Sequence, residues 1–243
     1  MGLPKDKLPV LEEFVTIQGE GVNIGKPYYF IRVGGCPLRC RFCDSEYTWT
    51  MKPESLVSLD SVIDRAIKQC KENGIEWISI TGGEPLLYPK QLLKMMAMFY
   101  EADISVHIET SGRYYDENVH AACDIYSVDA KTPCTAEMME GDFLGKENLR
   151  SYDQVKCLIE TVEDLEYAYR LNQELAGVCT MVLQPFNVSP KQGGWMKPSI
   201  DVGVGLRKLL NFFHASQSMG HKWVNVIITP QIHVLAYGNK PGV

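Results

Sequence analysis

Three cysteines lie within one short segment, and their side chains are the most distinctive chemical groups in the sequence. They are Cys36, Cys40 and Cys43, in the spacing C-x3-C-x2-C. One loop can bring these three thiolates together, and clustered thiolates select zinc or iron–sulfur centres. A structural zinc site normally has four protein ligands, and no other cysteine or histidine lies nearby in the sequence to complete one. Three cysteines on a [4Fe–4S] cluster leave one iron without a protein ligand, so the spacing favours a reactive cluster.

A second motif, Thr81-Gly-Gly-Glu84-Pro, follows an apolar run at 76–80. Its two glycines would let a ligand approach the backbone, where exposed N–H and C=O groups can bind a polar head group. On its own the motif is an ordinary connection from a strand to a helix. The cysteines likewise follow an apolar run, at 28–33. Because chemistry in parallel α/β folds gathers at the carboxyl ends of strands, we expect both motifs at one edge of a sheet.

Strand-length apolar runs recur along the chain and are joined by helical patterns at 58–73, 89–101 and 163–176. Ser58 is the expected N-cap of the first helix, and Gly74 its stop. Apolar runs without polar alternation, joined by helices, predict an α/β fold with a mostly parallel sheet. We expect one domain over residues 1–243. The expected strands are 28–33, 76–80, 104–109, 124–128, 153–159, 179–184 and 223–228.

The composition is that of an ordinary globular chain. Of 243 residues, 45% are hydrophobic and 22% charged, and the formal net charge is −6. An acidic chain without a basic run is a poor candidate for binding nucleic acid or an anionic membrane. No apolar stretch approaches the roughly 20 residues that span a bilayer, and no export signal opens the chain, so we expect a cytoplasmic protein. Four further cysteines are expected to be buried, and Cys134 has no expected role; the four are Cys70, Cys123, Cys157 and Cys179.

The cysteine spacing and the Gly-Gly-Glu turn together resemble the radical S-adenosylmethionine superfamily. In that superfamily the open iron of the cluster binds the amino and carboxylate groups of S-adenosylmethionine. The resemblance implies a partial (incomplete) TIM-like barrel of mostly parallel strands, with the cluster on Cys36, Cys40 and Cys43. The residues that it assigns to S-adenosylmethionine are Phe42, Cys43, Asp44, Gly83, Glu84, Thr110, Asp129, Ala130, Lys131, Gln184, Pro185, Phe186 and Asn187.

Three further features resemble the 7-carboxy-7-deazaguanine synthases within this superfamily. They are Thr16-Ile-Gln-Gly-Glu20-Gly21, Cys43-Asp-Ser45, and the segment from Gln231-Ile-His233 to Val243. The resemblance implies that a 5′-deoxyadenosyl radical removes the C6 hydrogen of 6-carboxy-5,6,7,8-tetrahydropterin. The ring then contracts to 7-carboxy-7-deazaguanine and ammonia leaves, an early step toward queuosine and archaeosine, with S-adenosylmethionine regenerated as a cofactor.

The same resemblance implies a Mg²⁺ ion bound by the Ser45 hydroxyl, by water and by the carboxylate of the substrate. Arg32, in an apolar strand, needs an anionic partner, either that carboxylate or a structural Asp or Glu. A flavodoxin or ferredoxin as electron donor and a homodimer are also implied, and the segment 187–199 has no assignment. The residues assigned to the substrate are Ile17, Gln18, Gly19, Glu20, Arg32, Thr81, His233 and Val243.

Two other functions remain open from the sequence. An activase that generates a glycyl radical on a partner enzyme shares the cysteine spacing and the length, but lacks the Ile-Gln-Gly-Glu-Gly segment. A metal-binding or electron-carrier module would bind a closed cluster and catalyse nothing.

Overall fold

The computed structural model describes residues 3–41, 43–186 and 200–237, which contain one nine-stranded sheet. Its order is β3-β1-β2-β4-β5-β6-β7-β8-β9, and neighbours from β2 to β9 run parallel. The sheet does not close, because β3 and β9 are its edges. These features confirm the expected α/β fold with a partial barrel. The strands are β1 Lys7–Ile17, β2 Pro27–Val33, β3 Leu56–Ser58, β4 Trp77–Gly82, β5 Ser105–Thr110, β6 Ile125–Ala130, β7 Gln154–Ile159, β8 Thr180–Pro185 and β9 Val226–Ile228.

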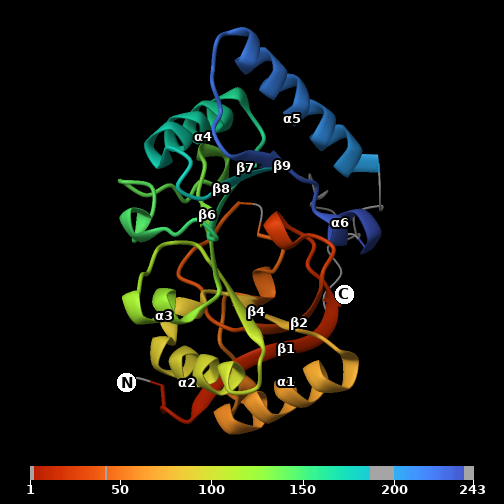
Figure 1. The fold of residues 1–243 in the computed structure, drawn as a ribbon, viewed down its shortest axis with the longest axis vertical. Coiled ribbons are helices and arrows are strands. Elements are labelled where there is room, and N and C mark those ends of the chain that lie inside the picture. Colours follow the sequence, from red (N-terminus) through yellow and green to blue (C-terminus); the bar gives the residue numbers. More distant parts are fainter. Residues whose placement is uncertain (1–2, 42, 187–199, 238–243) are drawn as a thin grey trace.

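The helices lie outside the sheet, with α1, α2 and α3 toward one end and α4 and α5 toward the other (Figure 1). Helix α2 contacts β5, α4 contacts β7 and α5 contacts β8. The three expected helices are confirmed within a residue of their predicted bounds, and α3, α5 and α6 were not predicted. The helices are α1 Leu59–Asn73, α2 Pro89–Tyr100, α3 Glu117–Ala122, α4 Val162–Leu175, α5 Ile200–Ser218 and α6 Ile232–Tyr237.

Strand β1 was also missing from the prediction, although it is the longest in the sheet. It pairs antiparallel with both β2 and β3, and its register shifts between Val10 and Glu12. The carboxylates that break its apolar pattern have partners: Glu12 accepts from Arg32 Nε at 3.1 Å, and Glu13 accepts from the Tyr29 hydroxyl at 3.0 Å. Strand β9 is shorter than the run at 223–228 suggested.

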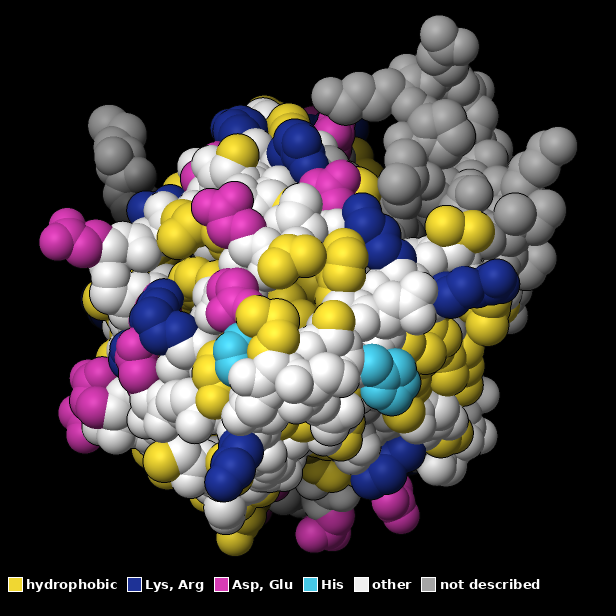
Figure 2. Space-filling view, turned by 90° about the horizontal axis from the view of Figure 1, so that it is seen from above, with side chains coloured by type: hydrophobic (Ala, Val, Ile, Leu, Met, Phe, Trp, Pro, Cys, Tyr) yellow, Lys and Arg dark blue, Asp and Glu magenta, His cyan; other side chains and the backbone are white. Residues whose placement is uncertain are grey.

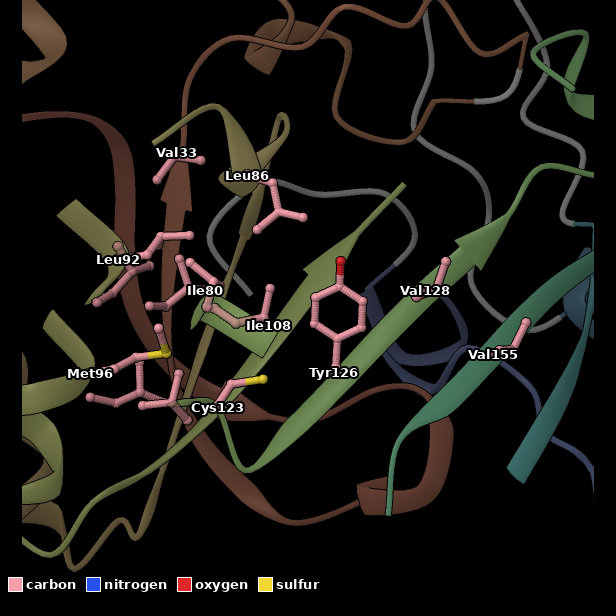
Figure 3. Close-up of a cluster of buried hydrophobic side chains, with 14 of the residues drawn as sticks. Val33, Ile80, Leu86, Leu92, Met96, Ile108, Cys123, Tyr126, Val128 and Val155 are labelled. Atoms are coloured by element: carbon pink, nitrogen blue, oxygen red, sulfur yellow. The ribbon is translucent and has the colours of Figure 1, made fainter. Parts of the chain in front are cut away.

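The hydrophobic core lies between the sheet and its helices. Figure 3 shows Ile80 of β4 and Ile108 of β5 directed toward Leu92 and Met96 of α2. All four side chains are buried, which removes them from water and stabilises the packing of helix on sheet. The cysteines expected to be buried are confirmed in the core: Cys70, Cys123, Cys157 and Cys179.

The surface fits the acidic, mixed composition. On the face in Figure 2, side chains of both charges are interspersed with hydrophobic ones. Among the described residues, no helix combines the length and the apolar character needed to cross a bilayer.

Candidate active site

One pocket lies at the carboxyl ends of the parallel strands and brings together most of the predicted site residues. Parallel strands direct these ends to the same edge, so side chains distant in sequence meet there. The cysteine loop after β2 and the segment after β1 complete the lining. The predicted residues that line the pocket are Ile17, Gln18, Gly19, Glu20, Arg32, Cys36, Cys40, Cys43, Asp44, Ser45, Thr81, Thr110, Asp129, Ala130, Lys131, Gln184 and His233.

Several predicted residues do not belong to this lining. Gly83, Glu84, Pro185 and Phe186 lie beside the pocket and form no part of its wall. Phe186 is buried, and its amide donates to the carbonyl of Ile159 at 3.0 Å. Three predicted residues, Phe42, Asn187 and Val243, lie outside the described residues, as does the segment 187–199.

The three cysteines of the loop suit a cationic cluster. Burial raises the pKa of each thiol, and for each of them one other thiol of the loop raises it further. When three thiols of one loop become thiolates, they select zinc or an iron–sulfur cluster. Among the described residues, no three His, Cys, Asp or Glu side chains stand at metal-binding distances. The side chains of Cys36, Cys40 and Cys43 must therefore turn toward one another to share a cluster.

Arg39 and Ser45 shape the two ends of this loop. The Arg39 guanidinium donates to the carbonyls of Cys36 at 2.8 Å and Leu38 at 2.7 Å, which fixes the backbone between the first two cysteines. The Ser45 hydroxyl is buried and lies 3.8 Å from Cys43 Sγ. It thus places an oxygen beside the last cysteine, where the sequence predicted one.

The Gly-Gly-Glu turn packs directly on the cysteine loop. The amide of Gly83 donates to Val33 O at 2.8 Å, and that of Glu84 donates to Gly35 O at 2.7 Å. A Cβ added at Gly83 would lie 2.0 Å from Gly35 O. The sequence suggested that glycine here admits a ligand, and the structure adds that it admits the neighbouring backbone.

The Glu84 carboxylate is fully buried and binds the protein itself. It accepts from the amide of Leu86 at 3.1 Å, the hydroxyl of Thr110 at 2.7 Å and the amide of Ser111 at 3.0 Å, and it also accepts from the Ser111 hydroxyl. Glu84 therefore ties the turn after β4 to the end of β5.

A buried ammonium, Lys156 of β7, lies at the centre of a charged cluster in the pocket. Its Nζ is 2.7 Å from Glu20, 3.1 Å from Glu109 and 3.3 Å from Asp129. Burial alone would lower the pKa of Lys156, but the three carboxylates raise it well above its ordinary value. Burial would likewise raise the pKa of Glu109, but Lys156, with Gln18 donating at 3.0 Å, keeps it well below its usual range. Both groups are ionised at neutral pH.

Helix α6 covers the segment that follows β1. The amide of Ile232 donates to Gly19 O at 3.0 Å, and Gln231 Nε2 donates to Glu20 Oε1 at 2.5 Å. A Cβ at Gly19 would lie 2.2 Å from His233 Nδ1, so glycine is needed for this close packing. The two segments resembling the 7-carboxy-7-deazaguanine synthases therefore meet in space, as that resemblance implied.

Arg32 has a structural partner as well as a place in the pocket wall. Its Nε lies 3.1 Å from Glu12 Oε2 across the β1–β2 ladder, which confirms the expectation of an anionic neighbour. Burial alone would lower its pKa, but Tyr47, Asp44 and Glu12 raise it. A guanidinium has five N–H donors, so one partner leaves donors for a ligand.

Sequence reasoning missed several lining residues, of which Lys156 is the most consequential. Glu109 is the last residue of the expected strand 104–109, and Lys156 lies inside the expected strand 153–159. A lone lysine in a buried strand was the available signal, because an ammonium is rarely buried without partners. The other lining residues not predicted are Phe14, Thr16, Phe30, Leu38, Trp49, Gly82, Ser111, Thr135, Leu158 and Gln231.

Known proteins resemble this chain in sequence and in fold. A 7-carboxy-7-deazaguanine synthase of Pyrobaculum aerophilum is 27% identical over 241 residues, covering 97% of each chain. Another, of Methanospirillum hungatei, is 32% identical over 164 residues, covering 68% of this chain and 66% of the relative. The crystal structure of QueE from Escherichia coli has the same fold, with a TM-score of 0.63 at 22% identity and coverage of 92% and 94%. These relatives confirm the resemblance found in the sequence. Because the radical SAM superfamily matches residues 30–164, more than half of the chain, the protein belongs to that superfamily.

Proposed function

We propose that the protein is a radical SAM carbon–nitrogen lyase, a 7-carboxy-7-deazaguanine synthase. It converts 6-carboxy-5,6,7,8-tetrahydropterin to 7-carboxy-7-deazaguanine with loss of ammonia, in 7-deazapurine biosynthesis. The observation that carries this proposal is a single pocket in which the cysteine loop faces the segment Gln18–Glu20. A glycyl-radical activase has no use for that segment, and relatives that match along the whole chain are named as synthases.

Two cofactors follow from membership of the superfamily. Cys36, Cys40 and Cys43 would hold a [4Fe–4S] cluster, and their position together in the lining of one pocket supports this role. Bound together, the cluster and S-adenosylmethionine supply a one-electron cleavage of the sulfonium that starts hydrogen-atom abstraction. Asp44 and Gly83 border the cluster loop, so we assign them to S-adenosylmethionine. The residues from the ends of the later strands that we also assign to it are Thr110, Asp129, Ala130, Lys131 and Gln184.

The chain's own residues bind and orient the pterin. Gln18 and Glu20 present amide and carboxylate groups to the N–H edge of the ring, which needs acceptors. Arg32, with Glu12 fixing its Nε, is oriented to receive the substrate carboxylate. Thr81 and His233 also line the pocket, and we assign them to the substrate.

A Mg²⁺ ion beside Ser45 is a further part of the proposal. The Ser45 hydroxyl is buried and lines the pocket, and the exposed Asp44 precedes it. A hard cation that keeps several waters would need few protein oxygens here, and it would offset negative charge on the substrate.

Other properties rest on the resemblance. We propose a flavodoxin or ferredoxin as the electron donor, a homodimer, and one radical SAM domain over residues 1–243. The single sheet from β1 to β9 supports the single domain. A cytoplasmic location is supported by the eight cysteines, all of which are free thiols.

Anaerobic turnover of the reduced, reconstituted protein with the carboxylated pterin tests the function. The expected product is 7-carboxy-7-deazaguanine, identified by its absorbance and mass. Cys40→Ala should lose the cluster and turnover, because it removes one of three ligands. Cys70→Ala is the matched control: Cys70 lies on the buried face of α1, outside the pocket lining, so iron content should persist. No deazaguanine from the wild type, or full turnover by Cys40→Ala, would overturn the proposal.

A further inference from the structure

Lys156 links parts of the pocket that are far apart in the sequence. Its side chain is only 4% exposed, and its ammonium contacts Glu20 after β1, Glu109 near the end of β5 and Asp129 near the end of β6. One ammonium therefore lies within 3.3 Å of all three carboxylates. The position of Glu20, a proposed substrate ligand, therefore depends on a residue of β7 that is 136 positions away in the sequence.

The ammonium also determines the charge of these carboxylates. Asp129 has a second cation, because Lys131 Nζ lies 3.6 Å from it. Glu20 also accepts from Gln231 and lies 4.0 Å from His233 Nε2, and Glu109 also accepts from Gln18 and Ser79. His107 and Arg32 lie near enough to Glu109 to interact with its charge, but burial lowers the pKa of His107 to about 4 and Arg32 pairs with Glu12. Lys156 is therefore the cation that contacts both carboxylates directly. Carboxylates this close repel one another, and without a cation they take up protons. A protonated carboxyl group donates a hydrogen bond where an ionised one only accepts.

Glu20 can bind the N–H groups of a ligand only if its carboxylate accepts hydrogen bonds. Glu20 Oε2 faces Lys156, while Oε1 accepts from Gln231 at the base of α6, so both oxygens are held in fixed directions. A carboxylate has about four lone-pair sites, so each oxygen has a further site for an N–H group of the ligand. The contact with Lys156 thus keeps Glu20 ionised and, together with Gln231, fixes its orientation.

We propose that Lys156 is a positioning residue of the pocket: it holds Glu20 and Glu109 as ionised, oriented acceptors and thereby selects a ring that presents several N–H donors. This inference rests on the proposed function, because the pterin is the ring in question. Lys156 acts through Glu20 and Glu109, and it has no chemical step of its own.

The test measures binding of 6-carboxy-5,6,7,8-tetrahydropterin to the reconstituted protein by anaerobic calorimetry, together with kcat and KM. Lys156→Met should weaken binding about tenfold or more, because it removes a charge-assisted contact and lets the acceptors protonate. KM should rise while kcat changes little. Binding by Lys156→Met should also tighten as the pH rises, since the carboxylates then regain their charge. Lys156→Arg keeps the cation and should recover most of the affinity.

Two controls separate positioning from general stability. Lys146 also binds two carboxylates, Asp142 at 3.1 Å and Glu174 at 2.6 Å, but lies outside the pocket lining, so Lys146→Met should bind the pterin normally. In a Glu20→Gln background, Lys156→Met should have a much smaller effect, because its main target is already neutral.

The outcomes are distinct. Binding by Lys156→Met within twofold of the wild type, or an equal loss in the Glu20→Gln background, overturns the inference while the proposed function stands. Should Lys156→Met fail to fold, Lys156→Gln combined with Glu109→Gln removes one charge of each sign, and unchanged binding by that variant overturns it instead. A wild type that neither binds nor converts the pterin overturns both proposals.

Discussion

The hydroxyl of Thr110 donates to the carboxylate of Glu84 at 2.7 Å, joining the end of β5 to the turn after β4. Ser111 donates to the same carboxylate through its amide at 3.0 Å. Because β4 and β5 are neighbours in the sheet, this contact fixes two adjacent strand ends at the rim of the pocket. Glu84 thus shapes the proposed S-adenosylmethionine site from beneath its surface.

Replacement of Glu84 by Ala should destabilise the fold by about 2–4 kcal/mol, because buried donors of Thr110 and Ser111 lose their acceptor. Anaerobic urea denaturation measures this change. Glu101→Ala, at the exposed end of α2, is the control and should change stability by less than about 0.5 kcal/mol. Equal stability of the two variants would contradict the role given to Glu84.

Gly83→Ala should displace the cysteine loop, because the new Cβ would collide with the carbonyl oxygen of Gly35. That atom is backbone and cannot rotate away, so we expect reduced iron incorporation, measured as iron per chain after reconstitution. Gly203→Ala is the matched control: a Cβ there meets nothing within 4 Å, and alanine favours the α5 helix. Normal iron content in Gly83→Ala would show that the loop tolerates the shift.

His107 predicts a pH dependence of stability. Burial lowers its pKa to about 4 from 6.5, so the folded protein favours the neutral ring. The unfolded chain binds a proton more readily, and stability therefore falls as pH drops below 6.5 and stops falling near 4. Between pH 7 and pH 5 this group should remove about 2 kcal/mol.

The measurement is anaerobic denaturation of the wild type and of His107→Gln at stepped pH. The variant has no ring to titrate, so its stability should change less over the same interval. If stability changed with pH equally in the two proteins, groups other than His107 would cause the pH dependence.

Ser45→Ala should lose most of the Mg²⁺ stimulation of turnover, because it removes the proposed oxygen ligand, while Ser45→Thr keeps a hydroxyl and should retain it. Ser55→Ala is the control: Ser55 is also buried, but its hydroxyl donates to Lys52 O at 2.6 Å, away from the pocket. An unchanged Mg²⁺ response in Ser45→Ala would remove Ser45 from the metal site.

Most of the correct predictions of the fold and the site came from short local motifs. The spacing of Cys36, Cys40 and Cys43 and the turn at Gly83 are short-range patterns, so they point to the cluster loop without knowledge of the fold. Apolar runs also predicted the parallel strands, since strands covered by helices are continuously hydrophobic. Strand β1 was not predicted, because Glu12 and Glu13 interrupt its apolar run and their hydrogen-bond partners come from other segments.

Contacts between distant segments could not be predicted in this way. The sequence places Lys156 in an expected strand without a partner, because its three carboxylates come from three other places in the chain. Nothing near Glu84 in the sequence indicates that Thr110 will occupy its carboxylate. Such pairings arise only when the sheet order brings strand ends together.

The strands at the two borders of the sheet, β3 and β9, each contain only three residues. An open barrel has free borders, and a long unpaired border strand is a template on which another chain can add a strand and start aggregation. Short border strands offer few backbone groups for such pairing. The molecule can therefore keep its barrel incomplete, with room for large ligands, at little risk of polymerising through its borders.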